Sequence, residues 1–393
     1  MTNTKRSIKL LFFVTSFYWF SMYGYIPTFA PYIESLGASH RLIGLIVGSY
    51  GFTQMLIRIP LGIFSDRLNK RKIFVVTGIS LSIISSTGMY FSESPYLILL
   101  FRSLAGASAA TWVTFIVLFS SYFSQEETAK SVAIMDSGVK TGQVLAMFTA
   151  GIIAQRFGQQ SPFILAALGG IIGLTLSLRV KESNDVEHKP VNVRELLQVI
   201  SNQRFLIVSF LGILSMLITY ASTFGFVPLL ARRLGASEFQ LGLLTTLTTI
   251  PGIFSALLGG TYFRRKFGEK KTIIIGFLLI SFSCILVPTV NQVSSLYLAQ
   301  ILNGFGQGLV FPLLMGLSIK GVESSKRGTA MGFFQAIYGL GMFTGPVLLG
   351  FLSDLFGLRT GFWVIAVLGI TAALLAQVYI RENSIEVSTT MKG

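Results

Sequence analysis

Cysteine and histidine are nearly missing from this chain of 393 residues, which contains one cysteine and two histidines. Cys284 has no second cysteine with which to form an intrachain disulfide, and His40 and His188 lie far apart in the sequence. The sequence therefore predicts neither a disulfide nor a Cys/His metal site.

Charged residues are also scarce. They make up 12% of the chain against 52% hydrophobic residues, and the mean hydropathy is +0.69. This is too little polar surface to cover a soluble globule, so we expect a membrane protein. The chain has no Gly-x-x-x-x-Gly-Lys-Ser/Thr run for a nucleotide phosphate and no room for a soluble catalytic domain, which argues against an enzyme.

Apolar stretches recur along the chain, and each is long enough as a helix to cross a bilayer core of about 30 Å. We count twelve, six in each half, over residues 9–33, 41–63, 73–92, 96–119, 131–154, 162–178, 205–230, 239–260, 272–290, 296–319, 328–353 and 361–380.

The two halves of the chain repeat each other. The motif Leu-Gly-Ala-Ser occurs at 36–39 and again at 234–237, a displacement of 198. Glycines match at this displacement or, upstream of the motif, at 201, as in the pairs Gly44 and Gly242, Gly62 and Gly260, Gly106 and Gly304, and Gly24 and Gly225. Duplication in so hydrophobic a chain is typical of secondary transporters, in which two similar bundles rock about one central site.

The predicted fold class is an all-α integral membrane protein with twelve transmembrane helices in two pseudo-symmetric six-helix bundles. We expect an N-terminal bundle over 1–180, a cytoplasmic linker over 181–204, and a C-terminal bundle with a short cytoplasmic tail over 205–393.

Basic residues outnumber acidic ones by 31 to 16, and their positions predict the orientation. Of the 31, 23 fall before the first span, after the last, or in loops on the same side as the termini, and five fall in loops on the other side. Both termini are therefore expected in the cytoplasm. The net charge of +15 is spread over short loops beside anionic headgroups, so we expect membrane lipid and no nucleic acid as a partner.

The loop after the second span carries a family motif. Gly62, Asp66, Arg67 and Arg71 stand at spacings that resemble Gly-x-x-x-Asp-Arg-x-Gly-Arg-Arg/Lys, the signature of the major facilitator superfamily, although the second glycine of that signature is displaced or lost. The equivalent loop of the second half keeps Gly260 and Arg265 but has Arg264 in place of the acid. The resemblance extends over the whole chain.

The resemblance implies two six-helix halves and transport by alternating access. It also implies that Gly62 permits a close helix approach and that Asp66 faces the N-terminal end of a helix in the other half, so that this loop latches the cytoplasmic side. In the alternative interpretation, the basic residues Lys70, Arg71 and Lys72 serve only to set the topology.

Helix 4 adds a second resemblance. Arg102 followed by Gly106 and small residues looks like the helix 4 signature of proton-coupled facilitators. A charged side chain at this depth is costly and usually faces a cavity, although hydrogen bonding to neighbouring helices is the alternative role. Gly106 is expected to pack helices together. Drug/proton antiporters carry Gly-Pro late in helix 5, whereas this chain has Gly138 and Gly142 there without a proline, and we expect these two glycines to serve as helix-packing or hinge positions. The Gly-Pro stands in helix 11 instead, in a helix-packing or hinge segment that contains Gly341, Gly345 and Pro346.

Three further charged residues fall within the predicted spans. Asp136 and Lys140 are four residues apart on one helix face, in the order that favours an ion pair. Either they neutralise each other, or Asp136, the only carboxylate well inside a span, exchanges a proton. Helix 2 places Gln54 and Arg58 on one face, and Arg58 either lines the pathway or snorkels to the cytoplasm.

The charges inside the spans favour an anionic, zwitterionic or neutral substrate over a cation. The predicted spans of the first half contain three bases, Arg58, Arg102 and Lys140, but only one acid, Asp136. The spans of the second half offer only uncharged polar groups. Residues that could line the cavity, or could equally face lipid or partner helices, are Tyr18, Tyr23, Tyr25, Asn303, Gln307, Gln335 and Tyr338.

The expected function is secondary active transport of a small organic molecule across a bacterial cytoplasmic membrane, with efflux driven by proton influx as the first interpretation. Proton-coupled uptake and organic-anion antiport are the alternatives, and a non-transporting membrane sensor is a remote one. No cofactor is expected, because a proton gradient would supply the energy, and we expect a monomer.

Overall fold

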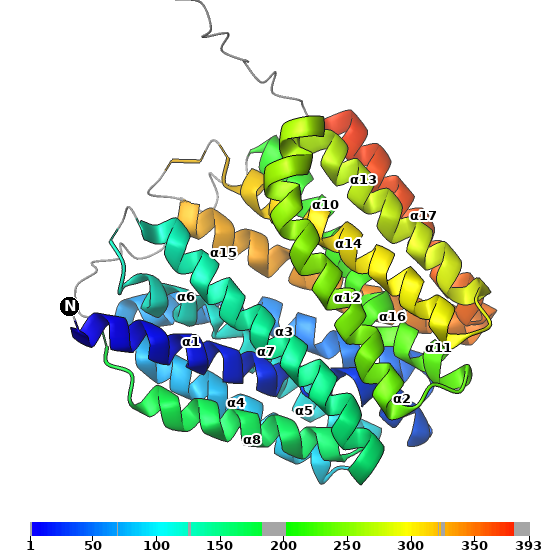
Figure 1. Ribbon diagram of the computed structural model, residues 1–393, viewed down its shortest axis with the longest axis horizontal. Helices are drawn as coiled ribbons and strands as arrows, with labels where there is room; N and C mark the ends of the chain where they lie inside the picture. The colour runs from blue at the N-terminus through cyan, green and yellow to red at the C-terminus, as the bar shows by residue number, and fades with distance from the viewer. Residues whose placement is uncertain are drawn as a thin grey trace, which may run out of the picture.

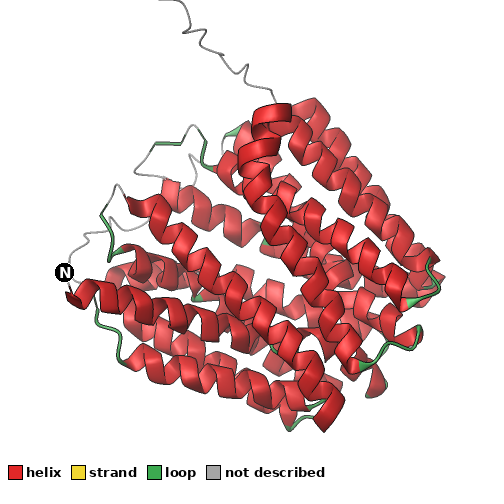
Figure 2. Cartoon of the chain, viewed as in Figure 1, coloured by secondary structure: helices red, strands yellow, loops and turns green. Residues whose placement is uncertain are grey.

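The computed structural model describes residues 2–68, 70–124, 127–182, 202–320, 322–323 and 327–380. All regular structure within these ranges is helical (Figure 2). Among the described residues, nine stretches are long and apolar enough to cross a membrane, and one of them, Glu238–Thr289, holds two crossings. Two more helical crossings, over 2–35 and 128–157, complete the twelve that the sequence predicts, so the fold class is confirmed.

The first six crossings follow one another with short connections. They are α1 (Thr2–Tyr23) with α2 (Ile26–Ser35), α3 (His40–Leu68), α4 (Arg71–Tyr90), α5 (Pro95–Ala110) with α6 (Trp112–Ser120), α7 (Thr128–Phe157) and α8 (Ser161–Leu178). Helices suit this environment because every backbone hydrogen bond is made within the segment. Proline stands at the start of α5 and near the start of α8, where no hydrogen-bond partner for an N–H is lost.

The second six crossings repeat the pattern. They are α10 (Gln203–Ala221), η2 (Ser222–Phe226) and α11 (Val227–Arg233) in one crossing, α12 (Glu238–Leu258) with η3 (Gly259–Phe263), α13 (Arg264–Leu286) with η4 (Val287–Thr289), α14 (Val293–Ser318), α15 (Arg327–Ile337) with α16 (Gly339–Phe356), and α17 (Leu358–Tyr379). Most of the predicted linker, residues 183–201, lies outside the described residues.

Equivalent glycines bring equivalent helices together in the two halves. A Cβ at Gly106 of α5 would overlap the carbonyl oxygen of Tyr50 in α3, and a Cβ at Gly304 of α14 would overlap the carbonyl oxygen of Thr248 in α12. Tyr50 and Thr248 are themselves 198 positions apart. The displacement found in the sequence therefore relates positions that occupy the same place in the packing of each half.

The halves meet along two helix pairs, α3 with α16 and α7 with α12 (Figure 1). Small residues allow this approach: Gly44 lies against the backbone of Pro346, and Gly151 lies against Gly242. Both contacts are near the end of the molecule opposite the chain termini, where α2 and α11 end and α3 and α12 begin. We call this the distal end.

Helix breaks occur at equivalent places in the first crossing of each half. Gly24 and Tyr25 separate α1 from α2, and the wide turn η2, which contains Gly225, separates α10 from α11. Gly24 and Gly225 are the pair related by 201 positions. Each half thus begins with a long helix that is followed, after the break, by a short helical segment at the distal end.

Candidate functional site

A small space lies between the two halves beside these helix breaks. Its lining comes from both bundles and consists of Met22, Tyr23, Ile26, Tyr50, Arg102, Tyr220 and Phe224. About 200 Å³ is free of atoms there, but no part of it is wide enough for a water molecule. A substrate could therefore enter only if the halves, or the segments at their breaks, moved apart.

Aromatic rings close this space from both sides. The rings of Tyr50 and Tyr220 are stacked with centroids 6.1 Å apart and an interplanar angle of 15°, and the rings of Tyr23 and Phe224 meet edge to face at 5.7 Å. Both pairs join the first half to the second. Such surfaces bind flat or apolar groups well, since each ring offers a large rigid face.

Arg102 is the charged member of the lining, and its side chain is almost completely buried. Its Nη1 donates a hydrogen bond of 2.6 Å to the hydroxyl of Tyr25, and its guanidinium carbon lies 4.5 Å from the ring centre of Tyr50 and 5.2 Å from that of Phe29. Within the described part of the chain Arg102 forms no ion pair, and its Nε has no hydrogen-bond partner. The charge is thus surrounded by aromatic faces and lacks a counter-ion.

A second buried guanidinium, that of Arg58, lies nearer the end of the molecule that carries the termini and contacts both halves. It donates to the backbone carbonyl oxygens of Ala109 at 3.4 Å and of Gln335, in the other half, at 3.3 Å. With its amide oxygen turned towards Arg58, Gln54 accepts from Nη1 at 3.2 Å and from Nη2 at 2.9 Å. Only 3% of Arg58 is exposed, so the alternative in which it snorkels to the cytoplasm does not hold in this structure.

The amide side chains of Asn303 and Gln307 in the second half form hydrogen bonds within their own bundle. Asn303 is fully buried and donates to the hydroxyl of Ser222 at 3.5 Å, while Gln307 accepts from Ser215 at 3.2 Å. In the described residues, Asn303 Oδ1 and Gln307 Nε2 have no partner. Tyr338 packs edge to face against Phe311 at 5.4 Å.

The three tyrosines expected from helix 1 have different positions. Tyr18 donates to the carbonyl oxygen of Ser108 at 2.8 Å and stacks on Phe115, so it packs inside the first bundle and does not line the space. Tyr23 lines the space, and Tyr25 holds Arg102.

Asp136 and Lys140 lie on the α7 face that packs on α12 farther along, through Met147 and Gly151. Asp136 is exposed, which differs from the low-dielectric setting that its depth in the span suggested. Among the described residues no ion pair joins Asp136 to Lys140, so the predicted pair does not form here.

The signature loops lie at the end of the molecule that carries the termini. A Cβ at Gly62 or at Gly260 would meet nothing within 4 Å among the described residues, so these residues show no close approach at Gly62 in this conformation. Arg67 and Arg265 are exposed, and Arg71 is buried and donates to Ser65 Oγ at 2.6 Å. The side chain of Asp66 lies outside what the structure describes, so its latch stays a prediction for a state in which this end is closed.

The remaining glycines of the predicted set lie at helix contacts. A Cβ at Gly142 would overlap the carbonyl oxygen of Ser16, and Cβ atoms at Gly341 and Gly345 would overlap carbonyl oxygens of α10. Gly138 sits more loosely, with Phe12 at 3.2 Å from its Cβ position. The Pro346 carbonyl lies against Gly44, so this segment of α16 contacts both halves.

Comparison with known proteins agrees with this architecture. The family model described as Major Facilitator Superfamily matches residues 11–230 and 209–390. This chain belongs to the major facilitator superfamily. It is therefore a multi-pass membrane transporter and not an enzyme.

Individual relatives are distant. An uncharacterized transporter of this type from Methanocaldococcus jannaschii is 26% identical over 373 residues, which cover 91% of this chain and 93% of that protein. The multi-drug resistance efflux pump PmrA of Streptococcus pneumoniae is 21% identical, with 92% of each chain covered. Among solved structures, a bacterial homologue of the human lysosomal transporter Spinster, in an inward-facing and occupied conformation, superposes with a TM-score of 0.78 at 16% identity and covers 96% of this chain and 97% of its own.

Sequence reasoning missed the polar residues that join the halves at the distal end, among them Glu34, His40, Arg233 and Asp354. Their bonds connect positions that are remote in sequence, so spacing gives no signal for them. One hint was available, because His40 and Glu238 open equivalent helices 198 positions apart and both are polar.

Proposed function

We propose that this protein exports a small amphiphilic organic anion or zwitterion across the cytoplasmic membrane, in exchange for protons. One observation carries the proposal: the pocket between the halves contains a buried guanidinium, Arg102, with aromatic faces around it and, among the described residues, no carboxylate paired to it. Bringing an anion to this charge relieves part of its desolvation cost, whereas bringing a cation adds to it.

The distribution of acidic residues supports the same substrate class. In the described part of the chain, Glu238 is the only buried carboxylate, and it lies at the distal end, where it pairs with Arg232 at 2.7 Å. A transporter of lipophilic cations needs an acid to receive its substrate, and no described acid lies in the pocket lining. The aromatic rings supply contact for an apolar or planar body.

Direction and orientation rest on the loops and on the relatives. The excess of basic residues on the side of the termini supports cytoplasmic termini, so the distal end would face outward. The halves contact each other at the distal end, and the described residues show no close approach at Gly62 or Gly260, an arrangement that fits an inward-facing state. Export is favoured by similarity to PmrA, which is named as a multi-drug efflux pump.

Binding to purified protein in lipid nanodiscs tests the substrate class. We would titrate ring compounds of matched size that carry a carboxylate, a neutral amide or an ammonium group. The carboxylate should bind at least about tenfold tighter than the ammonium compound, and Arg102→Lys should reduce that preference because it loses the planar donor fork. Arg156→Ala, at an exposed arginine, is the matched control and should change nothing. Tighter binding of the ammonium compound would show that the proposed substrate class is wrong.

In this proposal, proton exchange takes place at Asp136. Asp136 is exposed and lies on the α7 face that also carries Met147 and Gly151, which contact α12 of the other half. Asp136→Asn should abolish gradient-driven transport and spare exchange of substrate down its own gradient, since a neutral side chain cannot carry the proton. If the single variants Asp136→Asn and Lys140→Met fail but the double variant recovers coupled transport, the two residues are a structural pair and the proton site lies elsewhere.

A further inference from the structure

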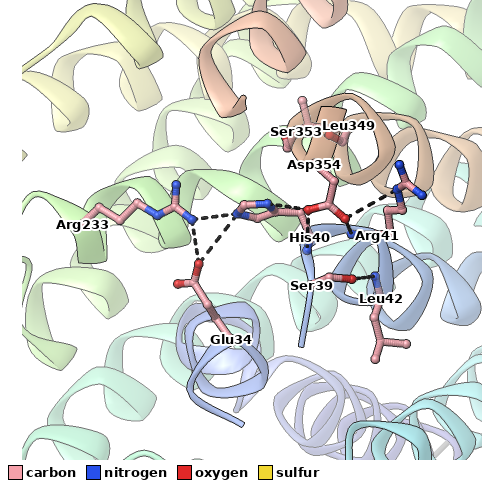
Figure 3. A network of polar contacts seen from close by, with 9 residues as sticks. All are labelled: Glu34, Ser39, His40, Arg41, Leu42, Arg233, Leu349, Ser353 and Asp354. Atoms are coloured by element: carbon pink, nitrogen blue, oxygen red, sulfur yellow. Dashed lines mark hydrogen bonds and ion pairs between the residues drawn. The ribbon is translucent and has the colours of Figure 1, made fainter. Parts of the chain in front are cut away.

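A polar network fastens the two halves together at the distal end (Figure 3). Arg233 of α11 donates to Glu34 Oε1 of α2 at 2.8 Å. Asp354 of α16 accepts from the backbone N–H groups of His40 at 3.1 Å and Arg41 at 3.0 Å, both at the start of α3. Each of these bonds joins one half to the other, and the side chains are partly exposed, so protons from the surrounding water can reach them.

The geometry fixes the protonation state of His40 in this network. Its Nε2 lies 2.7 Å from Nη2 of Arg233. A guanidinium has donors only, so Nε2 must accept and cannot carry a hydrogen. Nδ1, 2.8 Å from Asp354 Oδ1, then carries the hydrogen and donates it. His40 is therefore neutral while the distal end is closed.

The charges around His40 balance when it is neutral. The groups that face it are Glu34 on α2, Arg233 on α11, Asp354 on α16 and Arg41 on its own helix, two acids and two bases. A proton on the ring adds an uncompensated positive charge to this closed arrangement.

Protonation of His40 disturbs its contact with Arg233 far more than its contact with Asp354. A hydrogen on Nε2 would point at a donor nitrogen 2.7 Å away, so that contact must open. The new N–H would instead face Glu34 Oε1, 3.8 Å away, which is the oxygen that Arg233 binds. Arg233 thus loses one partner and competes for the other, while Asp354 keeps its two backbone N–H groups.

The segments that Arg233 and Glu34 tie together are the two short segments beyond the helix breaks. α2 begins just after Gly24 and Tyr25, and α11 follows η2. Residues at or beside these breaks, Tyr23, Ile26 and Phe224, line the pocket that contains Arg102. The network therefore closes the distal cover of the pocket, and the helix breaks are the places where the cover can bend.

We propose that His40 is a proton-operated latch: its protonation frees Arg233 and lets α11 swing away from α2, while the clamp of Asp354 on α3 holds. This inference rests on the proposed function only in placing the distal end outside the cell. With that orientation, acid outside the cell would protonate His40 and favour opening towards the outside.

Hydrogen–deuterium exchange of the intact protein in nanodiscs tests the latch without substrate or gradient. Exchange of residues 222–236 is followed at about pH 7.5 and pH 5.5, on either side of the ordinary histidine titration, with labelling times scaled for intrinsic exchange. Residues 349–356, which carry Asp354, are the internal control. In the wild type we expect exchange of the first segment to rise about tenfold at the lower pH, and the second to stay protected.

Two substitutions separate the roles of the two ring nitrogens. In His40→Gln the amide oxygen reaches the place of Nε2, so Arg233 keeps its acceptor and the segment should stay protected at both pH values. In His40→Asn the amide reaches only the place of Nδ1, so Asp354 keeps its donor, Arg233 loses its acceptor, and the segment should exchange fast at both pH values.

Three results would overturn the proposal. A pH response that survives in His40→Gln would assign the titration to Glu34 or Asp354. Protection of residues 222–236 in His40→Asn would show that Arg233 does not depend on Nε2. Equal release of residues 349–356 would indicate general opening of the distal end. None of these depends on transport, so failure of the proposed function would be seen separately.

Discussion

The two halves of this transporter use the same backbone positions for different chemistry. Arg102 of the first half corresponds, 198 positions on, to Gln300, and Tyr50 corresponds to Thr248. In each half the residues at these two positions contact each other. Arg102 lies over the ring of Tyr50 in the first half, and Gln300 accepts a hydrogen bond of 3.2 Å from the hydroxyl of Thr248 in the second. Duplication has thus kept the helix contacts, while the side chains that meet there have diverged.

The divergence places the buried charge within the predicted spans in the first half only. Arg58 corresponds to Ala256, so Arg58 and Arg102, the two buried arginines within those spans, have uncharged counterparts in the second half. The buried polar groups within the second bundle are neutral amides and hydroxyls, and leaving one of their atoms unpaired, as at Asn303 Oδ1, costs less than burying a guanidinium without an acid. We infer that the charged group of a substrate would bind the first half and that the second half closes over its apolar part.

The largest effect on substrate binding should come from replacing Arg102 by glutamine, the residue at the equivalent position of the second half. Arg102→Gln should weaken binding of an anionic substrate by about 100-fold, because a buried charge-assisted contact is worth roughly 3 kcal/mol. The fold should persist, since Gln300 occupies the equivalent site. Isothermal titration with the carboxylate compound measures the change, and unchanged affinity would place Arg102 in a purely structural role.

A second comparison concerns the signature loops at the end with the termini. Asp66 and Arg264 are equivalent, and only the first matches the family signature. Asp66→Asn should lower transport by roughly tenfold or more while substrate binding persists, because a gate is lost and not a pocket. Arg264→Asn, which breaks only a partly exposed pair with Glu269, is the control. Equal effects of the two variants on transport would contradict a specific latch at Asp66.

The sequence predicted the scaffold well because the scaffold rests on local signals. Long apolar spans and the regular displacement of the glycines are both visible in one chain, and Gly106 and Gly304 mark contacts that the structure contains. The site was predicted only in part. Arg102 stood out by its depth, but its ring partners Tyr50 and Phe29 come from other crossings, and only the tertiary fold brings them together.

Other features of the site had a weak local signal or none. Gly225 and Pro228 lie at and just after η2, but they do not show that the helix widens there. The exposure of Asp136 depends on tertiary packing around α7, which no local pattern encodes. The bonds of His40 reach Arg233 and Asp354, so they become visible only when the two halves are assembled.

An intermediate effect is expected when the aromatic ring of Tyr50 is removed. Tyr50→Thr, which copies the second half, removes the nearest aromatic face from Arg102 and should weaken anion binding by about tenfold, since a desolvated cation–π contact is worth roughly 1 to 2 kcal/mol. Tyr50→Phe keeps the face and should bind nearly as well as the wild type. If the two variants bind alike in the same titration, the ring face does not contribute.

The smallest effect concerns the shared packing. Gly106→Ala and Gly304→Ala each force a Cβ against a backbone carbonyl, so both should lower the free energy of unfolding by about 1 to 3 kcal/mol. Gly62→Ala, whose Cβ would meet nothing within 4 Å, should lower it by less than about 0.5 kcal/mol. Thermal unfolding in detergent compares the three. A large loss in only one of the first two would break the equivalence of the halves.

Transport into proteoliposomes tests the central claim most directly. With the membrane potential clamped and a proton gradient imposed, wild-type protein should accumulate the carboxylate compound against its gradient and leave the ammonium compound of equal size at equilibrium. Arg102→Gln should abolish the accumulation. Gradient-driven accumulation of the ammonium compound, or of the carboxylate by the Arg102→Gln variant, would contradict the account.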